Sequence, residues 1–165
     1  MRALLQRLFT PNAPPVALAP RSLPLQADPE LIWAEQVTPE KLLALFRQAY
    51  MEVESLPDDS LMLTLTDGCR VRVRVDAMRK LLSFTALYCL KDDAARHDKL
   101  ELANRINDHA VLVRLSVTHD TTLVSDHYIH LDGVFTPRQL VEGARLFAHT
   151  THVAIQRLDT ANVVA

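Results

Sequence analysis

The segment from Asn104 to Leu158 limits the possible folds of this chain more than any other. It reads as a helix, two strands and a second helix, separated by very short turns. The strand-like stretches 111–118 and 122–131 alternate apolar and polar residues, a pattern that buries one face of a sheet and exposes the other. In 136–158 the apolar residues recur at helical spacing instead. This order predicts a sheet with helices on one of its faces.

Four more strand-like segments lie upstream, at 51–56, 61–66, 69–76 and 81–90. The alternation is cleanest in the middle two, where every second residue is Leu or Val and Asp67-Gly68 supplies a typical hairpin turn. Two further helices are predicted, one capped by Thr38 and begun by Pro39, the other at 98–108. The sequence therefore predicts an α+β fold with a single antiparallel sheet, a meander plus a hairpin. Its helices pack on one face, in the order α-β4-α-β2-α.

We expect one folded domain preceded by an arm. At 165 residues a single domain is the usual number, and we place it at 37–159, followed by a C-terminal tail at 160–165. Residues 1–36 form an N-terminal arm and Pro-rich tether, because six of the nine prolines fall within 11–29 and exclude helix and central strand there. Trp33 is expected to dock the end of this arm on the domain. A PxxP-type ligand is the alternative interpretation of the tether.

The overall composition excludes several classes of protein. A net charge of −2 and a pI near 6.4 give no general reason to expect nucleic-acid binding. The chain has three glycines, too few and too scattered for a Gly-rich phosphate loop. It has no apolar run of the roughly 18 residues that a membrane span needs, and no signal-peptide cleavage site follows the N-terminus. We therefore expect a cytoplasmic protein without a cofactor.

The two cysteines, Cys69 and Cys89, form no CxxC pair and lie in neighbouring predicted strands. If the turn between Asp76 and Leu81 sets the register, Cys69 lies opposite Tyr88 and Cys89 points to the other face. A slip of one residue would reverse this and permit a disulfide. We favour two buried, reduced thiols.

The sharpest local feature is the series Arg70, Arg72 and Arg74, whose side chains project from one face of a strand. Arg114 joins them if its strand sends its polar residues to the same side. Guanidinium groups in a row suit carboxylates or phosphates. Three interpretations are open: a solvated face paired with acidic residues of adjoining strands, an acidic or polar protein partner, and nucleic acid. The last lacks the stacking aromatic residues that sheet-based RNA binders place beside basic ones.

Neither the histidines nor the nucleophilic residues form a recognisable catalytic or metal site. His127 and His130 have odd spacing on a predicted strand, so they point to opposite faces. His149 and His152 could share a helix face, but a third ligand would have to come from elsewhere. The sequence has no nucleophile elbow of the G-x-S-x-G kind. We expect no catalytic residues and no metal site; a small enzyme of unrecognised type is the alternative.

Three short motifs carry a resemblance to a known family: Asn104-Arg105-Ile106-Asn107 near a helix end, Arg114 in the next strand, and Asp132-Gly133-Val134-Phe135-Thr136-Pro137 before the last helix. In these the chain resembles the YbjN-like family, described as bacterial sensory transduction regulators, over about 37–158. Ile106 departs from the family pattern, which has an aromatic residue there, and the turn at Asp120-Thr121 lacks the usual glycine. The resemblance implies a type III secretion chaperone-like fold and a dimer-prone, non-enzymatic binding domain.

Asn104 and Asn107 also have a structural interpretation. Asn is unfavourable inside helices and favourable at their ends, and this helix is expected to end near His109. Side-chain hydrogen bonds to the backbone that follows would fix the entry into the next strand. This role needs no ligand.

These observations favour a non-enzymatic protein-binding domain, either chaperone-like or an adaptor with a regulatory role, that forms a homodimer. The candidate protein-binding residues are Arg70, Arg72, Arg74, Arg114 and Trp33. A nucleic-acid-binding regulator that uses the Arg70, Arg72 and Arg74 face is the alternative. The dimer is expected because the face opposite the helices keeps more apolar residues than a monomer needs to leave wet. These are Met62, Leu81, Leu87, Cys89, Leu112 and Val124.

Overall fold

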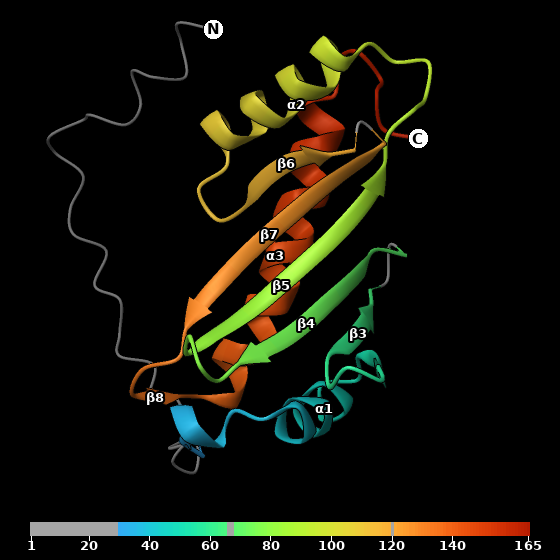
Figure 1. The fold of residues 1–165 in the computed structure, drawn as a ribbon. Coiled ribbons are helices and arrows are strands. Elements are labelled where there is room, and N and C mark those ends of the chain that lie inside the picture. Colours follow the sequence, from blue (N-terminus) through green and yellow to red (C-terminus); the bar gives the residue numbers. More distant parts are fainter. Residues whose placement is uncertain (1–29, 66–67, 120) are drawn as a thin grey trace, which may run out of the picture.

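The computed structural model describes residues 30–65, 68–119 and 121–165. Within them, the strands form one large antiparallel sheet of six strands and a small sheet of two strands. The small sheet lies near the lower end of the large one, where Figure 1 labels β8. Across the large sheet the strands follow the order β2 (Glu52–Ser55), β3 (Leu61–Thr64), β4 (Arg70–Asp76), β5 (Leu81–Cys89), β7 (Thr122–His130) and β6 (Arg114–Thr118). The predicted meander and hairpin are therefore both present in one sheet. They join where β5 pairs with β7.

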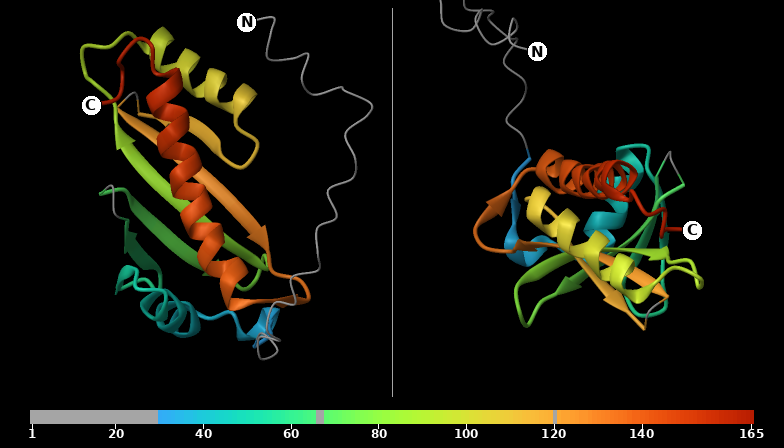
Figure 2. Two further views of the ribbon diagram at one scale, coloured as in Figure 1. Left: turned by 180° about the vertical axis from the view of Figure 1, so that it is seen from behind. Right: turned by 90° about the horizontal axis from the view of Figure 1, so that it is seen from above.

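The helices lie on one side of this sheet, as the sequence predicts. They are α1 (Pro39–Gln48), α2 (Arg96–His109) and α3 (Pro137–Leu158). Figure 2 shows α3 running diagonally across the back of the strands. Thr38 and Thr136 cap α1 and α3, and each accepts a hydrogen bond from the backbone N–H three residues on. The predicted α+β class and the packing of helices on a single face are confirmed.

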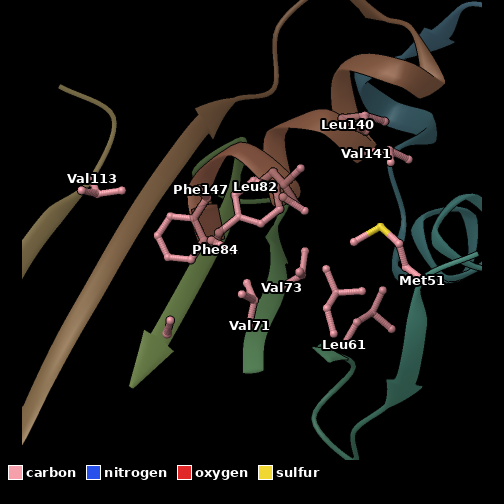
Figure 3. Packing of buried hydrophobic residues seen from close by; sticks show 14 of the residues in the cluster. Met51, Leu61, Val71, Val73, Leu82, Phe84, Val113, Leu140, Val141 and Phe147 are labelled. Carbon is pink, nitrogen blue, oxygen red and sulfur yellow. The ribbon is translucent and has the colours of Figure 1, made fainter. Parts of the chain in front are cut away.

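The core fills the space between the sheet and α3. Phe84 of β5 and Phe147 of α3 are fully buried, with ring centroids 6.1 Å apart. Leu82 and Leu140 lie in the same layer, as Figure 3 shows. Gly143 allows α3 to approach the sheet, because a Cβ there would lie 3.2 Å from the Cδ1 of Ile129. This tight layer fixes which face of each strand is buried.

The N-terminal end of the described chain packs differently from the prediction. β1 (Ile32–Trp33) pairs with β8 (Val134–Phe135), two short strands that the predicted order did not contain. Ile32 is 1% exposed and anchors this segment, whereas Trp33 is 58% exposed. Docking through Trp33 is thus wrong, since strand alternation turns Ile32 inward and the indole outward. The first ten residues and the proline tether at 11–29 lie outside the described residues.

The C-terminal end also belongs to the folded structure. Val163 is 1% exposed, and Val164 forms an isolated antiparallel bridge with Leu90. The backbone N–H of Ala165 donates to the carbonyl of Cys89 at 2.9 Å. The packed part of the chain therefore extends beyond 37–159 at both ends.

Asn107 ties the end of α2 to the edge strand β6. Its Nδ2 donates to the carbonyl of Leu115 at 2.9 Å, and its Oδ1 accepts from the N–H of Leu115 at 2.7 Å. These bonds satisfy one backbone donor and one acceptor on the outer edge of the sheet. The predicted structural role is confirmed for Asn107, while Asn104 lies exposed on the helix. β6 begins at Arg114 and is thus shorter than the predicted strand at 111–118.

Candidate protein-binding face

The side of the large sheet that faces away from the three helices is called the open face below. Figure 1 looks onto this face, with α3 behind the strands. Strand register brings four residues into one row across it: Arg72 pairs with Thr85, Thr85 with Asp126, and Asp126 with Arg114. Arg72 and Asp126 thus lie only two strands apart. The sheet brings together polar side chains that are far apart in the sequence.

All four predicted arginines project from the open face. Arg70, Arg72 and Arg74 are exposed, while Val71 and Val73 between them are at most 1% exposed on the other side. Arg114 is also exposed and joins them through its register partner Asp126. The structure thus meets the condition set for Arg114, that its strand sends its polar residues to the same side. It also separates the four arginines into two pairs with different surroundings.

Arg70 and Arg72 pair with carboxylates of the chain itself. Nη2 of Arg70 lies 3.2 Å from Oε1 of Glu54, which is on β2, two strands away. Arg72 forms an ion pair with Asp58, and its Nε donates to Oγ of Ser60 at 3.0 Å. Two of the four arginines therefore fit the interpretation of a solvated face paired with nearby acids.

The contacts of Arg72 also order the turn between β2 and β3. Ser60 is fully buried and donates to Oδ1 of Asp58 at 2.6 Å. The hydroxyl of Ser60, and then the charge of Arg72, hold the pKa of Asp58 below its usual range. Because Arg72 contacts both residues, its guanidinium is part of the turn rather than a group held ready for a ligand.

Arg74 and Arg114 have no ion pair among the described residues. Arg74 lines a shallow hollow of about 190 Å³ with Arg79, Ser83 and Tyr128. Asp126, the register partner of Arg114, accepts a hydrogen bond from Oγ1 of Thr85 at 2.8 Å instead of pairing with the arginine. These two guanidinium groups are therefore the ones available to a carboxylate from outside the chain.

One half of the open face carries apolar side chains. Leu87 is 66% exposed and lies directly opposite Val124 across β5 and β7. Cys89 is exposed two residues further along β5. Leu112, expected on this face, instead lines a groove beside α3 with Val153, because the chain bends before β6 begins.

The two cysteines point to opposite faces of the sheet, as the register set by the turn between Asp76 and Leu81 requires. Sγ of Cys69 lies 3.4 Å from the hydroxyl oxygen of Tyr88, so the predicted opposition of these two residues is confirmed. The two cysteines form no disulfide with each other, and Cys89 is on the opposite face. The expectation that both are buried is wrong for Cys89, because the open face has no cover in the described structure.

The histidines lie as the strand and helix periods predict. His127 points toward the helices and stacks against Phe84 and Phe147, with ring centroids 6.1 and 6.4 Å apart, while His130 is exposed. Burial lowers the pKa of His127, and a hydrogen bond to the backbone of Leu112 opposes that shift in part. In residues 30–65, 68–119 and 121–165, no three His, Cys, Asp or Glu side chains are grouped as a metal site requires.

Trp33 is exposed but does not belong to the open face. It lies in the small β1–β8 sheet below the end of the six strands (Figure 1). The structure therefore does not bring it together with the arginines. Two residues that the sequence analysis did not single out do belong to the open face, namely Tyr128, which is 52% exposed, and Asp126. Period-two counting along 122–130 places both on the side of His130, so the signal was present in the sequence.

Comparison with known proteins shows the fold. No family model matches the sequence, and the search of curated proteins finds no significant relative. Among solved structures, YbjN from E. coli, described as a provisionally assigned transcription regulator, superimposes with a TM-score of 0.63 at 14% identity. The match covers 77% of this chain and 94% of that one.

Two chaperone structures are similar at lower scores. The Yersinia pestis type III secretion chaperone SycH, in complex with a fragment of YscM2, gives a TM-score of 0.49 at 12% identity, covering 72% of this chain and 98% of its own. The HopA1–SchA chaperone–effector complex gives 0.44 at 14% identity, covering 67% and 92%. The chain has a YbjN-like α+β fold, as its motifs predicted, and this statement rests on the YbjN structure.

Even α3, with 22 residues, is not apolar enough for a membrane span, nor is any other helix in the described residues.

Proposed function

We propose that this chain is a non-enzymatic protein-binding domain, an adaptor or chaperone-like regulator, that binds its partner on the open face. One observation carries the proposal: a six-stranded sheet has helices on one face and, within the described residues, nothing on the other. On that other face Leu87 and Tyr128 are 66% and 52% exposed. Exposed apolar groups within a polar surface are typical of interaction sites.

The composition of the open face supports a protein partner. Tyr and Arg are enriched at the energetically important positions of protein interfaces, and the open face presents Tyr128 with Arg74 and Arg114. Leu87 and Val124 add an apolar centre. Such a surface offers apolar burial and directional hydrogen bonds to the same partner.

A tagged form of the chain, purified from its native cell, tests the proposal when Leu87→Asp is compared with Val111→Asp. Val111 is 97% exposed but lies outside the sheet, so its substitution introduces the same charge away from the open face. We expect wild type and Val111→Asp to retain the same partner and Leu87→Asp to lose it. Equal retention by all three proteins would contradict binding on the open face.

We propose in addition that two copies associate through the apolar half of the open face, defined by Leu87, Cys89 and Val124. A C2 dimer would bury these residues against their own copies, so a partner that contacts Leu87 would have to displace one copy. Light scattering over micromolar concentrations should report twice the mass of 18.6 kDa. A monomer at every concentration would refute the dimer without affecting the proposed binding of another protein.

Nucleic-acid binding is the second candidate, and Tyr128 is the observation that favours it. Its ring lies on the same face as Arg74 and Arg114, an arrangement that suits a stacked base with flanking phosphates. The YbjN structure is described as that of a provisionally assigned transcription regulator. Single-stranded and duplex oligonucleotides should then bind with an affinity that falls steeply as salt rises. Failure to bind at low salt would end this alternative.

A further inference from the structure

The four arginines of the open face differ in whether a carboxylate of the chain already pairs with them. Arg70 and Arg72 each contact a carboxylate of the chain, while Arg74 and Arg114 have no ion pair in the described residues. We propose that Arg74 and Arg114, with Tyr128 between them, bind an acidic, extended segment of another polypeptide. This inference rests on the proposed function and specifies its partner.

Strand register gives the dimensions of this site. Arg74 pairs with Ser83 and Ser83 with Tyr128, so Arg74 and Tyr128 are two strands apart, about 10 Å at the usual strand spacing. Arg114 pairs with Asp126 and is thus a diagonal neighbour of Tyr128, at about 7–8 Å. Tyr128 therefore separates two cationic groups on one continuous surface.

The hollow beside Arg74 marks one end of the site. It is about 190 Å³ in volume and is lined by Arg74, Arg79, Ser83 and Tyr128, among others. Arg79 is mostly exposed and lies 3.7 Å from Asp76, so its own ion pair is loose. The hydroxyl of Ser83 already donates to the backbone carbonyl of Arg74, whereas a carboxylate in this hollow would meet the guanidinium of Arg74. Such charge-assisted hydrogen bonds are among the strong ones in proteins.

The neighbouring acids indicate why the ligand is a polypeptide rather than a nucleic acid. Asp126 lies in the row that contains Arg114, and Asp76 lines the same hollow as Arg74. Glu54 and Asp58 flank the other side of the face. Each of these acids opposes any nearby anion, and a phosphate backbone, with a charge at every nucleotide, would meet more of them than a peptide with two carboxylates. A peptide can place single carboxylates at the two arginines and neutral residues between them.

The spacing of the two arginines predicts the pattern of the segment. Three strand spacings and an offset of two residues put their Cα atoms about 16 Å apart. An extended chain rises about 3.3 Å per residue, and the flexible side chains on both sides tolerate some mismatch. We expect two acidic residues about four to six positions apart, with an apolar or aromatic residue between them to pack on Tyr128.

A phage-displayed library of random linear 12-residue peptides tests the proposal without a known partner. Selection on the wild-type chain should enrich peptides with two Asp or Glu residues at this spacing around an apolar residue. Selection on the Arg74→Gln/Arg114→Gln variant should not enrich them. Enrichment of peptides without the acidic pair, or no enrichment at all, would overturn the inference. The proposed function would then still be decided separately by the Leu87→Asp comparison.

The strongest enriched peptide, made synthetically, gives a quantitative second test. Its Kd should weaken at least about tenfold in Arg74→Gln and in Arg114→Gln, the size expected for one lost charge-assisted contact. The matched control is Arg70→Gln, on the same face, which should change the Kd less than about threefold because Glu54 already pairs with it. Tyr128→Phe should bind like wild type and Tyr128→Ala should not. Equal losses in Arg70→Gln would contradict the assignment.

An oligonucleotide identifies the rival ligand. A twelve-nucleotide oligo-dT should not bind measurably under conditions in which the peptide does. If it binds in a salt-dependent manner, and loses binding in Arg74→Gln and Arg114→Gln, the site recognises nucleic acid and the inference is wrong.

Discussion

Strand β5 shows two different environments in consecutive residues. On the covered face, Leu82, Phe84 and Ala86 are at most 1% exposed, whereas Leu87, which follows Ala86 on the open face, is 66% exposed. The covered face meets α3 over its length, while the open face meets nothing in the described structure (Figure 2). One sheet thus provides both the core of the domain and the surface proposed for binding, and substitutions should affect the two separately.

The largest expected effect comes from the covered face. Phe84→Ala should lower the free energy of unfolding by about 3–5 kcal/mol, because it removes a fully buried ring from between the sheet and Phe147. Leu87→Ala, on the open face, should change the free energy of unfolding by less than about 0.5 kcal/mol. Urea denaturation followed by circular dichroism measures both. Similar losses in the two variants would contradict the separation of the faces.

The attachment of β6 to α2 should have the next largest effect. Asn107→Ala removes both hydrogen bonds to Leu115, and we expect a loss of about 1–3 kcal/mol. Asn104→Ala is the matched control from the same helix and should stay within about 0.5 kcal/mol of wild type. Equal effects would show that Asn107 does not anchor the strand edge.

His127 gives the covered face a dependence on pH. Because burial lowers its pKa in the folded chain, the unfolded chain takes up the proton first as pH falls. The neutral ring thus contributes its full stability above the ordinary pKa of about 6.5, and this contribution declines as pH falls below that value. His127→Phe should show a smaller loss of stability between pH 7.5 and pH 5.5 than wild type. An identical loss in both proteins would mean that other groups cause it.

The smallest effects on stability should come from the arginines of the open face. The Arg70–Glu54 pair is more than half exposed on both sides, and such pairs contribute about 0–1 kcal/mol. Arg70→Gln, Arg74→Gln and Arg114→Gln should therefore all unfold close to the wild-type urea midpoint. If Arg74→Gln or Arg114→Gln were strongly destabilised, loss of peptide binding in that variant would have a structural cause.

The sequence predicts the covered face well because burial imposes period-two and helical patterns directly on the chain. The alternation at 71–75 places three valines inward and predicts the outward direction of Arg72 and Arg74. The Asp76–Leu81 turn even predicts that Cys69 faces Tyr88, and the structure shows them in contact. Local rules of this kind need no knowledge of distant partners.

The open face is harder to predict because its chemistry depends on register between distant strands. Asp126 is a local neighbour of Arg114 across the β6–β7 hairpin, but nothing in the sequence indicates that Thr85 lies in the same row. Nor does the sequence show that Asp58 pairs with Arg72 and Glu54 with Arg70. It likewise does not show that Arg74 and Arg114 have no ion pair in the described residues. The small β1–β8 sheet was missed for a related reason, since strands of two residues have no period to detect.

The most direct test of the account combines binding and stability in one variant, Leu87→Asp. Capture of the native partner and the urea midpoint are measured on the same preparation, with Val111→Asp beside it. We expect Leu87→Asp to keep the wild-type urea midpoint and to lose the partner, because position 87 lies on the open face and outside the core. A stable Leu87→Asp protein that still captures the partner would contradict it.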